Sequence, residues 1–249
     1  MSPVTTVLAP DLTDAPLSLL EENAGGDAAR DLDRHVDLLR HVGRGARGPL
    51  LRLYVPNPTL AFGRRDARLD GFDAAWETAA SAGFTPVIRS AGGRATAYHQ
   101  GTLIVDQIQP DPEPMLTHQQ RFAMFGDLFA DALRTVGVDA RVGEIPGEYC
   151  PGEFSVHGVG ADGVRVKLVG TAQRVVAGAW LFSSVVVVND AAPLRSVTAQ
   201  VYQDLGMELD PATVGAVEDV TSPRPSAVSV ADVAGAVVAT WEAAGYRFE

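Results

Sequence analysis

The chain has 249 residues, of which 46% are hydrophobic and 20% are charged, and it is long enough for one large domain or for one domain with a small appendage. Its formal net charge of −11 argues against nonspecific binding to nucleic acid or to anionic lipid. Its longest apolar run is about half the length that spans a bilayer, and the N-terminus lacks the basic region of a signal peptide. One cysteine cannot form an internal disulfide, so we expect a cytoplasmic protein with no nucleic-acid or membrane partner.

The first half of the chain predicts an irregular segment followed by helices and strands. Prolines and aspartates interrupt residues 1–28, so we expect an irregular N-terminal arm there. In chain order the next expected elements are a helix over 29–42, strands over 50–55 and 59–63, a helix over 73–82, and strands over 85–89 and 102–109. We expect Trp76 and Ala80 to face inward from the second helix. The last strand alternates apolar and polar residues, which predicts one buried face.

The second half begins with a helix expected over residues 118–136. Thr117 and Gln120 resemble a capping box at its start, and Phe122, Phe125 and Phe129 share one face of it, which predicts core packing. Strands are expected over 154–157, 164–176 and 180–188, followed by short helices after Pro193 and Pro211 and a final helix opened by Ser229. Because strands neither alternate regularly with helices nor all follow one another, the pattern favours an α+β fold with a mixed sheet and packed helices.

A glycine pair lies between two predicted strands in the segment RSAGGRATAYH, residues 89–99. Gly92 and Gly93 allow the backbone to approach a ligand closely, and successive N–H groups in such a turn can form an anion-binding concavity. Arg89 and Arg94 flank the pair. The segment is neither a P-loop nor a dinucleotide fingerprint, because no Gly-Lys-Ser/Thr and no helix follow the glycines. Taken alone, it is equally compatible with a simple hairpin connection.

The only lysine and the only cysteine of the chain lie 17 residues apart, at positions 167 and 150, in a chain with 19 arginines. Arginine's flat fork is a poor substitute where a compact charge must reach one oxygen, so Lys167 marks a position of possible function. A solvated surface lysine is the alternative. Cys150 precedes Pro151 and Gly152, which predicts a loop rather than a packed core. The alternative for Cys150 is a small buried hydrophobe.

Three segments in this order resemble the lipoate–protein ligase and octanoyltransferase family, part of the biotin/lipoate protein ligase superfamily. PNPTLAFGRRD resembles the upstream strand pair ending in glycine-arginine. RSAGGRATAYH resembles the Arg-x-x-Gly-Gly segment that ends in a histidine, here His99, and VKLVGTAQR resembles the segment in which the essential lysine is followed by a glycine, here Gly170. The resemblance covers roughly residues 30–190. It implies a largely antiparallel sheet with packed helices, a catalytic acyl-binding domain over residues 29–190, and a helical extension over 191–249 packed on that domain.

The resemblance also implies an activity: joining lipoate or octanoate to a lysine of a lipoyl domain or of a glycine-cleavage H-type acceptor protein. In the transferase chemistry Cys150 is the nucleophile, Lys167 holds the acyl carbonyl, acyl carrier protein is a possible donor, and no cofactor is needed. In the ligase chemistry ATP and magnesium form an acyl-adenylate. In both, Arg89, Gly92, Gly93, Arg94, His99 and Gly170 are the implied acyl- or adenylate-binding residues.

Details of the sequence favour the transferase without excluding the ligase or a non-catalytic acyl-binding module. Cys150 precedes the lysine motif, as in cysteine-dependent octanoyltransferases, and Arg94 stands where ligases commonly have a third glycine. The CPGEF surroundings of the cysteine and the glycine directly after His99-Gln100 depart from the family patterns. His157 is a candidate base or, alternatively, a histidine that faces water. The histidines lack metal-ligand spacing, which predicts no transition metal. Nine arginines in residues 40–94 suggest a docking face for an acidic partner.

Overall fold

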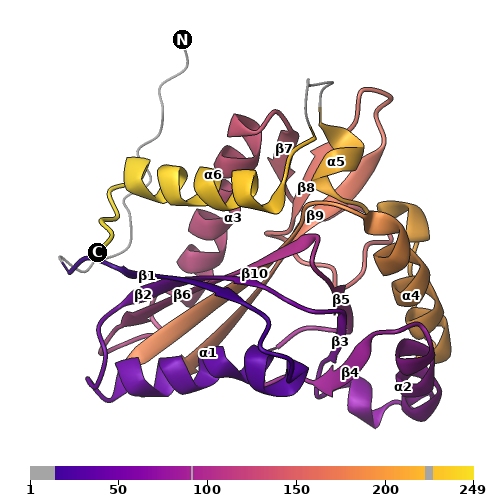
Figure 1. The fold of residues 1–249 in the computed structure, drawn as a ribbon, viewed down its shortest axis with the longest axis horizontal. Coiled ribbons are helices and arrows are strands. Elements are labelled where there is room, and N and C mark those ends of the chain that lie inside the picture. The colour runs from indigo at the N-terminus through magenta and orange to yellow at the C-terminus, as the bar shows by residue number, and fades with distance from the viewer. Residues whose placement is uncertain (1–14, 91, 222–226) are drawn as a thin grey trace.

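The computed structural model in Figure 1 describes residues 15–90, 92–221 and 227–249. Its main sheet has seven strands in the spatial order β1 (Ser18–Asn23), β2 (Leu50–Val55), β6 (Thr102–Pro110), β10 (Ala179–Val187), β9 (Arg165–Val176), β8 (Val156–Val159) and β7 (Asp139–Val142). Only β1 and β2 pair in parallel; the other neighbours in this sheet are antiparallel. The mixed, largely antiparallel sheet expected from the sequence is confirmed.

A second, smaller sheet holds the glycine pair of the sequence motif. Its strands lie in the order β4 (Thr85–Ile88), β3 (Thr59–Phe62) and β5 (Thr96–Tyr98), and the glycine turn connects β4 to β5. The helices α2 (Phe72–Ser81) and α4 (Ala191–Asp204) pack against each other beside this sheet (Figure 1). A short helix, η1 (Asp66–Arg68), joins β3 to α2. The glycine turn is therefore held by a separately packed cluster.

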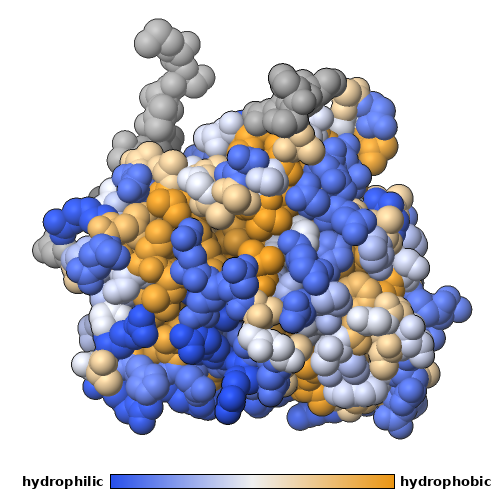
Figure 2. Space-filling model, in the orientation of Figure 1, coloured by the Kyte–Doolittle hydropathy of each residue, from blue (hydrophilic) through white to orange (hydrophobic). Residues whose placement is uncertain are grey.

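Helices cover both faces of the main sheet. The helix α1 (Ala28–Gly43) lies on one face, and α3 (His118–Thr135) and α6 (Val230–Ala243) lie on the other (Figure 1). The outer face of α1 is mostly hydrophilic, and hydrophobic side chains gather in the band between α1 and α6 (Figure 2). Because both faces are covered, β6 is buried on both sides, and the prediction of a half-buried strand was wrong. Its polar residues are therefore internal.

Aromatic side chains of α3 form the centre of the core, as their spacing predicted. Phe125 stacks on Phe182 of β10 with ring centroids 4.2 Å apart, and Phe129 meets Trp241 of α6 edge-on at 5.2 Å. Aromatic pairs of this kind each contribute roughly 0.5–1.5 kcal/mol beyond their burial. The Trp241 indole N–H donates to Oε1 of Gln107 at 2.6 Å, so the polar tip of this ring is satisfied inside the core. The α3–α6 layer is thus tied to β6.

The expected irregular arm is wrong at residues 18–23, which form the edge strand β1. Its backbone pairs in register with β2, and Leu17 bridges to Phe248 near the other end of the chain. Partners this distant in sequence leave no local signal in a segment rich in proline and aspartate. Residues 1–14 of the predicted arm lie outside the described residues.

Other differences concern the buried face of α2, the start of α3 and the strand β7. In α2 the buried residues are Ala75 and Ala79, whereas Ala80 is exposed and Trp76 is half-buried, so the predicted inward face was wrong by one position. Thr117 does not cap α3 with its side chain; its hydroxyl accepts a hydrogen bond from Arg121 instead. The strand β7 was not predicted, because it is a four-residue edge strand with alternating exposed residues.

The C-terminal part of the chain is helical. The helix α4 begins at Ala191, so Pro193 lies in its first turn, where a missing N–H costs nothing, rather than before a short helix as expected. The short helices η2 (Pro211–Thr213) and α5 (Val217–Val220) follow. Ser229 caps α6 and accepts a hydrogen bond from the backbone of Asp232, as predicted for the last helix. Within the described residues, no helix is long and apolar enough to cross a membrane.

Candidate active site

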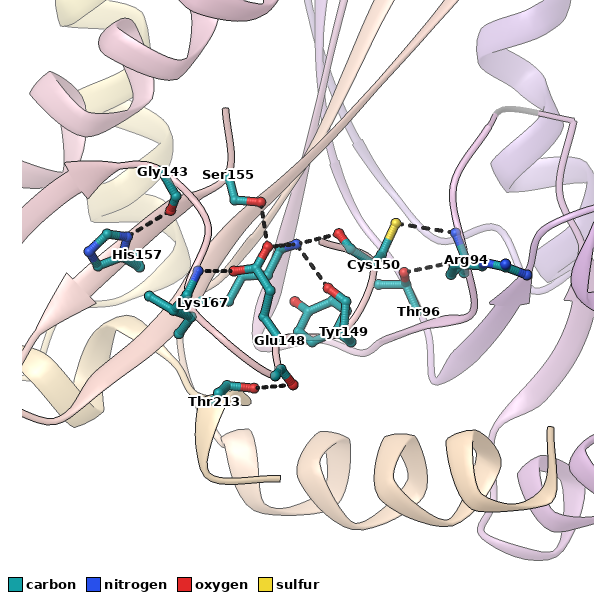
Figure 3. A network of polar contacts seen from close by, with 12 residues as sticks. Arg94, Thr96, Gly143, Glu148, Tyr149, Cys150, Ser155, His157, Lys167 and Thr213 are labelled. Atoms are coloured by element: carbon teal, nitrogen blue, oxygen red, sulfur yellow. Dashed lines mark hydrogen bonds and ion pairs between the residues drawn. The ribbon is translucent and has the colours of Figure 1, made fainter. Parts of the chain in front are cut away.

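Lys167 is buried inside the protein on β9, with a relative exposure of only 1%. Its Nζ donates to Oε1 of Glu148 at 2.9 Å, to the carbonyl oxygen of Tyr149 at 3.0 Å and to that of Cys150 at 2.8 Å (Figure 3). An ammonium group has three N–H donors, so all three are engaged by consecutive residues. A planar guanidinium cannot arrange its donors around one point in this way. This geometry explains a lysine in so arginine-rich a chain.

Glu148 joins Lys167 to both ends of the loop that carries the cysteine. Its Oε1 also accepts from the Ser155 hydroxyl at 2.7 Å, and its Oε2 accepts from the backbone N–H of Ile145 at 3.2 Å. The carboxylate side chain has no exposed surface. Burying an ion pair is costly unless further hydrogen bonds satisfy the charges, and here they do. Residues 145–155 are therefore held in a defined conformation without regular secondary structure.

Cys150 has a backbone conformation that non-glycine residues rarely adopt, with φ of 44°. Its N–H donates to the hydroxyl oxygen of Tyr202 at 3.0 Å, and its Sγ accepts from the backbone N–H of Arg94 at 3.2 Å. Burial raises the pKa of Tyr202, so this hydroxyl stays protonated and donates to the carbonyl of Ala95. Strained backbone persists where surrounding contacts enforce it, and such residues cluster at functional sites. The thiol is half-buried and aimed at the glycine turn.

The glycine turn approaches the cysteine closely. Gly93 has φ of +102°, and a Cβ there would lie 2.4 Å from Nη2 of Arg89 and 3.4 Å from Sγ of Cys150, so a side chain would be both strained and crowded. Arg89 braces the turn by donating to the carbonyl of Arg94 at 2.6 Å and to the Tyr98 hydroxyl at 2.9 Å. The turn therefore presents a backbone N–H, rather than a side chain, to the sulfur.

A permanent positive charge lies near the thiol. Burial alone would lower the pKa of Arg89, but its interactions with Tyr98 and Cys150 outweigh burial and raise the pKa. Burial raises the pKa of Tyr98. The Arg94 guanidinium points away from the thiol and pairs with Asp66 at 3.0 Å. Of the two predicted arginines, Arg89 thus supplies the charge at the site and Arg94 supplies its backbone.

A cavity of about 330 Å³ extends from the thiol between α1 and the main sheet. Cys150 and Gly93 line one part of it, Gly170 and Val185 form part of the sheet wall, and His35 of α1 lines the far part. This volume is at the small end of the range for ligand pockets. The part of this wall that β9 supplies is half-buried and lies beyond the last residues paired with β8. The cavity suits a narrow, mainly apolar ligand that ends at the sulfur.

The structure brings most of the predicted site residues to this cavity. Those that line it are Cys150, Lys167, Arg89, Gly92, Gly93 and Gly170. His99 does not line it: the ring Nδ1 accepts from the Gly101 N–H at 2.9 Å, and Nε2 donates to the carbonyl of Asp190 at 2.8 Å. His99 therefore joins two turns, and no local pattern could predict this contact because Asp190 lies 91 residues away.

His157 fits neither of its predicted alternatives. It is buried rather than facing water, and its Nδ1 donates to the carbonyl oxygen of Gly143 at 2.8 Å. Figure 3 shows it on the opposite side of Lys167 from the Cys150 sulfur. Its ring thus secures β8 to the segment before the cysteine loop and does not reach the thiol.

Sequence reasoning missed three residues at the site: Glu148, Tyr202 and His35. Glu148 has no distinguishing neighbour pattern, and Tyr202 belongs to a helix 52 residues downstream of the cysteine. His35 did carry a signal, because it lies next to Val36 on the helix face that Leu32 begins. A histidine on an apolar face is an inward-facing residue by the same periodicity that predicted the helix.

Comparison with known proteins gives a family match over most of the chain. The family model described as the lipoyl protein ligase A/B catalytic domain matches residues 27–242. An octanoyl-[GcvH]:protein N-octanoyltransferase of Geobacillus kaustophilus is 28% identical over 167 residues, which are 67% of this chain and 57% of that protein. A protein of the same name from an Exiguobacterium species is 29% identical over 65% of this chain and 56% of its own length. The chain therefore matches little more than half the length of these curated relatives.

Solved structures show the same fold at lower identity. A putative lipoate protein ligase from Thermoplasma acidophilum with bound lipoic acid superposes with a TM-score of 0.70 and 20% identity, covering 94% of this chain and 88% of that one. A lipoate-protein ligase A bound with ATP gives 0.68 with the same identity and coverage. At this identity the likeness concerns the fold. The α+β architecture inferred from the strand pattern is thus shared with these proteins.

Proposed function

The chain belongs to the lipoyl protein ligase A/B catalytic-domain family, and from that premise we propose that it transfers an octanoyl or lipoyl group to a lysine of an acceptor protein through a thioester on Cys150. The acceptor is a lipoyl domain or a glycine-cleavage H-type protein. The observation that carries the proposal is the placement of the chain's only thiol in the wall of a narrow cavity, under a backbone N–H. The names of the curated relatives support the same activity.

The proposed reaction has two acyl transfers. The Cys150 sulfur attacks the carbonyl carbon of the donor's acyl group, which is a thioester on acyl carrier protein or a lysine amide on an octanoylated H-type protein. A carbon–sulfur bond to Cys150 forms, and the bond to the donor sulfur or lysine nitrogen breaks. The donor thiol or amine leaves with the proton that Cys150 gave up. The neutral amine of the acceptor lysine then attacks the Cys150 thioester. A carbon–nitrogen bond forms, the bond to Cys150 breaks, and the thiol regains a proton from the amine.

Each transfer develops negative charge on the carbonyl oxygen beside the sulfur. The Arg94 N–H and the Arg89 cation lie next to the sulfur, where they can stabilise that charge. The resemblance implied instead that Lys167 holds the acyl carbonyl. In this structure all three Lys167 donors are engaged, so Lys167 can bind an acyl oxygen only by releasing Glu148 or one of two carbonyls. As the site stands, Lys167 acts as a positioning residue for the cysteine loop.

The engaged cations of the site favour the transferase over the ligase alternative, whose cofactor pair is magnesium-ATP. The cations that would hold phosphates are engaged: Lys167 by three acceptors, Arg94 by Asp66, and Arg89 by Tyr98 and a carbonyl. The proposed reaction therefore contains no adenylate step.

The decisive experiment is intact-mass analysis of the wild type and Cys150→Ser after incubation with an octanoylated carrier or H-type protein. The wild type should gain the mass of one octanoyl group, and hydroxylamine should remove it. Because the chain has a single cysteine, Cys150→Ser removes every possible protein thioester and should show no such adduct.

Three results would overturn the proposal or redirect it. Undiminished transfer by Cys150→Ser would exclude the thioester. Absence of an adduct together with lipoate-dependent ATP–pyrophosphate exchange would establish the ligase chemistry. Tight octanoate or lipoate binding with neither reaction would establish a binding module.

A further inference from the structure

The sheet wall of the acyl cavity consists of rows of residues that are paired across β6, β10 and β9. Ile104, Val185 and Gly170 form the row nearest Lys167, whose Cε lies 3.6 Å from the position that a Gly170 Cβ would take. The next row on the same face, about 7 Å farther along the strands, is Asp106, Ser183 and Ala172. Of this second row, Ser183 and Ala172 line the cavity, and Asp106 lies beneath His35, so polar side chains begin one row farther from Lys167.

The helix α1 covers these rows one turn at a time. Leu32 packs with Ile104 and Val185 over the first row, and His35 lies beside Asp106 in the second. Leu39, one turn farther, packs with Ile108 in a closed cluster that does not line the cavity. The cavity thus ends at the polar row, with His35 as its cover.

His35 is poorly satisfied for a buried polar side chain. Its relative exposure is 5%, and Nε2 of its ring has no hydrogen-bond partner among the described residues. The nearest charge is Oδ2 of Asp106, 3.5 Å from Nδ1. Burial would raise the pKa of Asp106, but His35 and Arg52 outweigh burial and lower it to about 2, so the carboxylate stays charged. Enclosing such an imidazole completely in hydrocarbon has a cost that a polarisable ligand atom reduces.

We propose that His35 is a specificity-determining residue that contacts the far end of the bound acyl chain and favours a sulfur-bearing dithiolane end over a plain alkyl end. The proposal rests on the proposed function only in taking an acyl chain as the ligand of this cavity. A methyl end packed against His35 leaves Nε2 of the ring without a hydrogen-bond partner among the described residues. Sulfur is a weak hydrogen-bond acceptor and makes favourable contacts with aromatic rings.

The equilibrium affinities of the protein for free acids measure this preference for sulfur whether or not transfer occurs. We would measure, by titration calorimetry on the wild type, the affinities for lipoate, for octanoate, and for an octanoate in which sulfur replaces one methylene near the far end. Both sulfur-bearing acids should bind about three- to tenfold more tightly than octanoate, the range expected for a sulfur–ring contact. Equal affinity of the wild type for octanoate and its sulfur-substituted analogue would overturn the proposal, with no variant needed.

A pair of variants on one helix assigns the preference to His35. In His35→Leu the affinity ratio between the sulfur-substituted acid and octanoate should fall to about one, with octanoate binding retained or improved. His41→Leu is the matched control, because His41 is exposed in the last turn of the same helix, and its ratio should equal that of the wild type. An unchanged ratio in a folded His35→Leu protein would overturn the assignment. Loss of transfer with an intact binding ratio would count against the proposed function alone.

Discussion

Two buried ion pairs lie near the two ends of the cavity and join different kinds of backbone. Lys167 and Glu148, 2.9 Å apart, hold an irregular loop, and the lysine also donates hydrogen bonds to two carbonyl oxygens of that loop. Arg52 and Asp106, 3.0 Å apart, lie opposite each other on the paired strands β2 and β6. The cysteine loop has no backbone hydrogen-bond ladder, so the Lys167–Glu148 pair holds it in place. The Arg52–Asp106 pair joins two strands that backbone hydrogen bonds already hold together.

This difference separates what each pair should control. Removing the loop pair should misplace Cys150 and impair chemistry, because nothing regular holds the loop in its place. Removing the sheet pair should lower stability while the strands keep their register. Buried pairs in general are weak evidence for net stabilisation, but removal of one partner leaves an uncompensated charge.

The largest effect is expected for Lys167→Ala. The variant leaves the Glu148 carboxylate buried without its cation, which should lower the free energy of unfolding by about 3–5 kcal/mol. Thioester formation should fall about a hundredfold or more, because small misplacements of a nucleophile have effects of this size. Denaturant unfolding and the rate of adduct formation measure the two. Lys167→Arg should not restore the rate, since a guanidinium cannot reproduce the three-donor arrangement. Arg165→Ala, exposed on the same strand, is the control and should behave as the wild type.

A smaller effect is expected for Glu148→Gln, which keeps the shape of the side chain and removes its charge. The Lys167 ammonium would keep its two carbonyl acceptors, so the free energy of unfolding should fall by about 1–3 kcal/mol. Adduct formation should slow less than in Lys167→Ala. The exposed loop residue Glu153 provides the control Glu153→Gln. A Glu148→Gln protein as fast and as stable as this control would show that the loop does not depend on the ion pair.

The Asp106 carboxylate of the sheet pair, whose charged form His35 and Arg52 both stabilise, should appear in the pH dependence of stability. The pKa of Asp106 is lowered from 3.8 to about 2 in the folded protein, so its charge stabilises the fold above pH 4, and this contribution is lost as the pH falls toward 2. The contribution is about 2 kcal/mol at its full value. Asp106→Asn should lack it, so the difference in unfolding free energy between wild type and variant should shrink from pH 5 to pH 2. A constant difference across that range would contradict the assignment.

The smallest effect is expected from charges that belong to neither pair. Arg52 and Arg89 of the arginine-rich segment are used internally, whereas Arg64 and Arg65 are exposed just after β3, beside the Asp66 that pairs with Arg94. If they attract an acidic partner, the double change to glutamine should slow transfer a few-fold at low salt and have no effect at high salt. Unfolding should not change. The control is Arg40→Gln, in the last turn of α1. Equal dependence of the transfer rate on salt in both variants would show that Arg64 and Arg65 do not dock a partner.

The sequence predicted those features that depend on neighbours in the chain. The α1 helix follows from the spacing of Leu32, Val36 and Leu39. The proximity of Cys150 to Lys167 follows from their short separation in the chain, which a hairpin closes. The glycine turn was predicted for the same reason. These are patterns of spacing within a few tens of residues.

The features that were not predicted depend on partners distant in sequence or on which acceptors a side chain's donors find in the folded protein. The strand β1 depends on β2 and on Phe248, and the backbone position of Cys150 depends on Tyr202. No spacing rule shows that Lys167 would use all its donors on the cysteine loop. That occupancy changed its proposed role from holding the substrate to positioning the nucleophile.

The single sulfhydryl has a practical consequence for following the protein in solution. A thiol-reactive fluorophore or spin label would attach at Cys150 alone, without removal of competing positions. Its signal would report whether the surrounding segment opens when a carrier or acceptor arrives, and how fast. The same property makes the unlabelled protein easy to inactivate with a covalent acyl mimic, and titrating that inactivation would count competent molecules in a preparation.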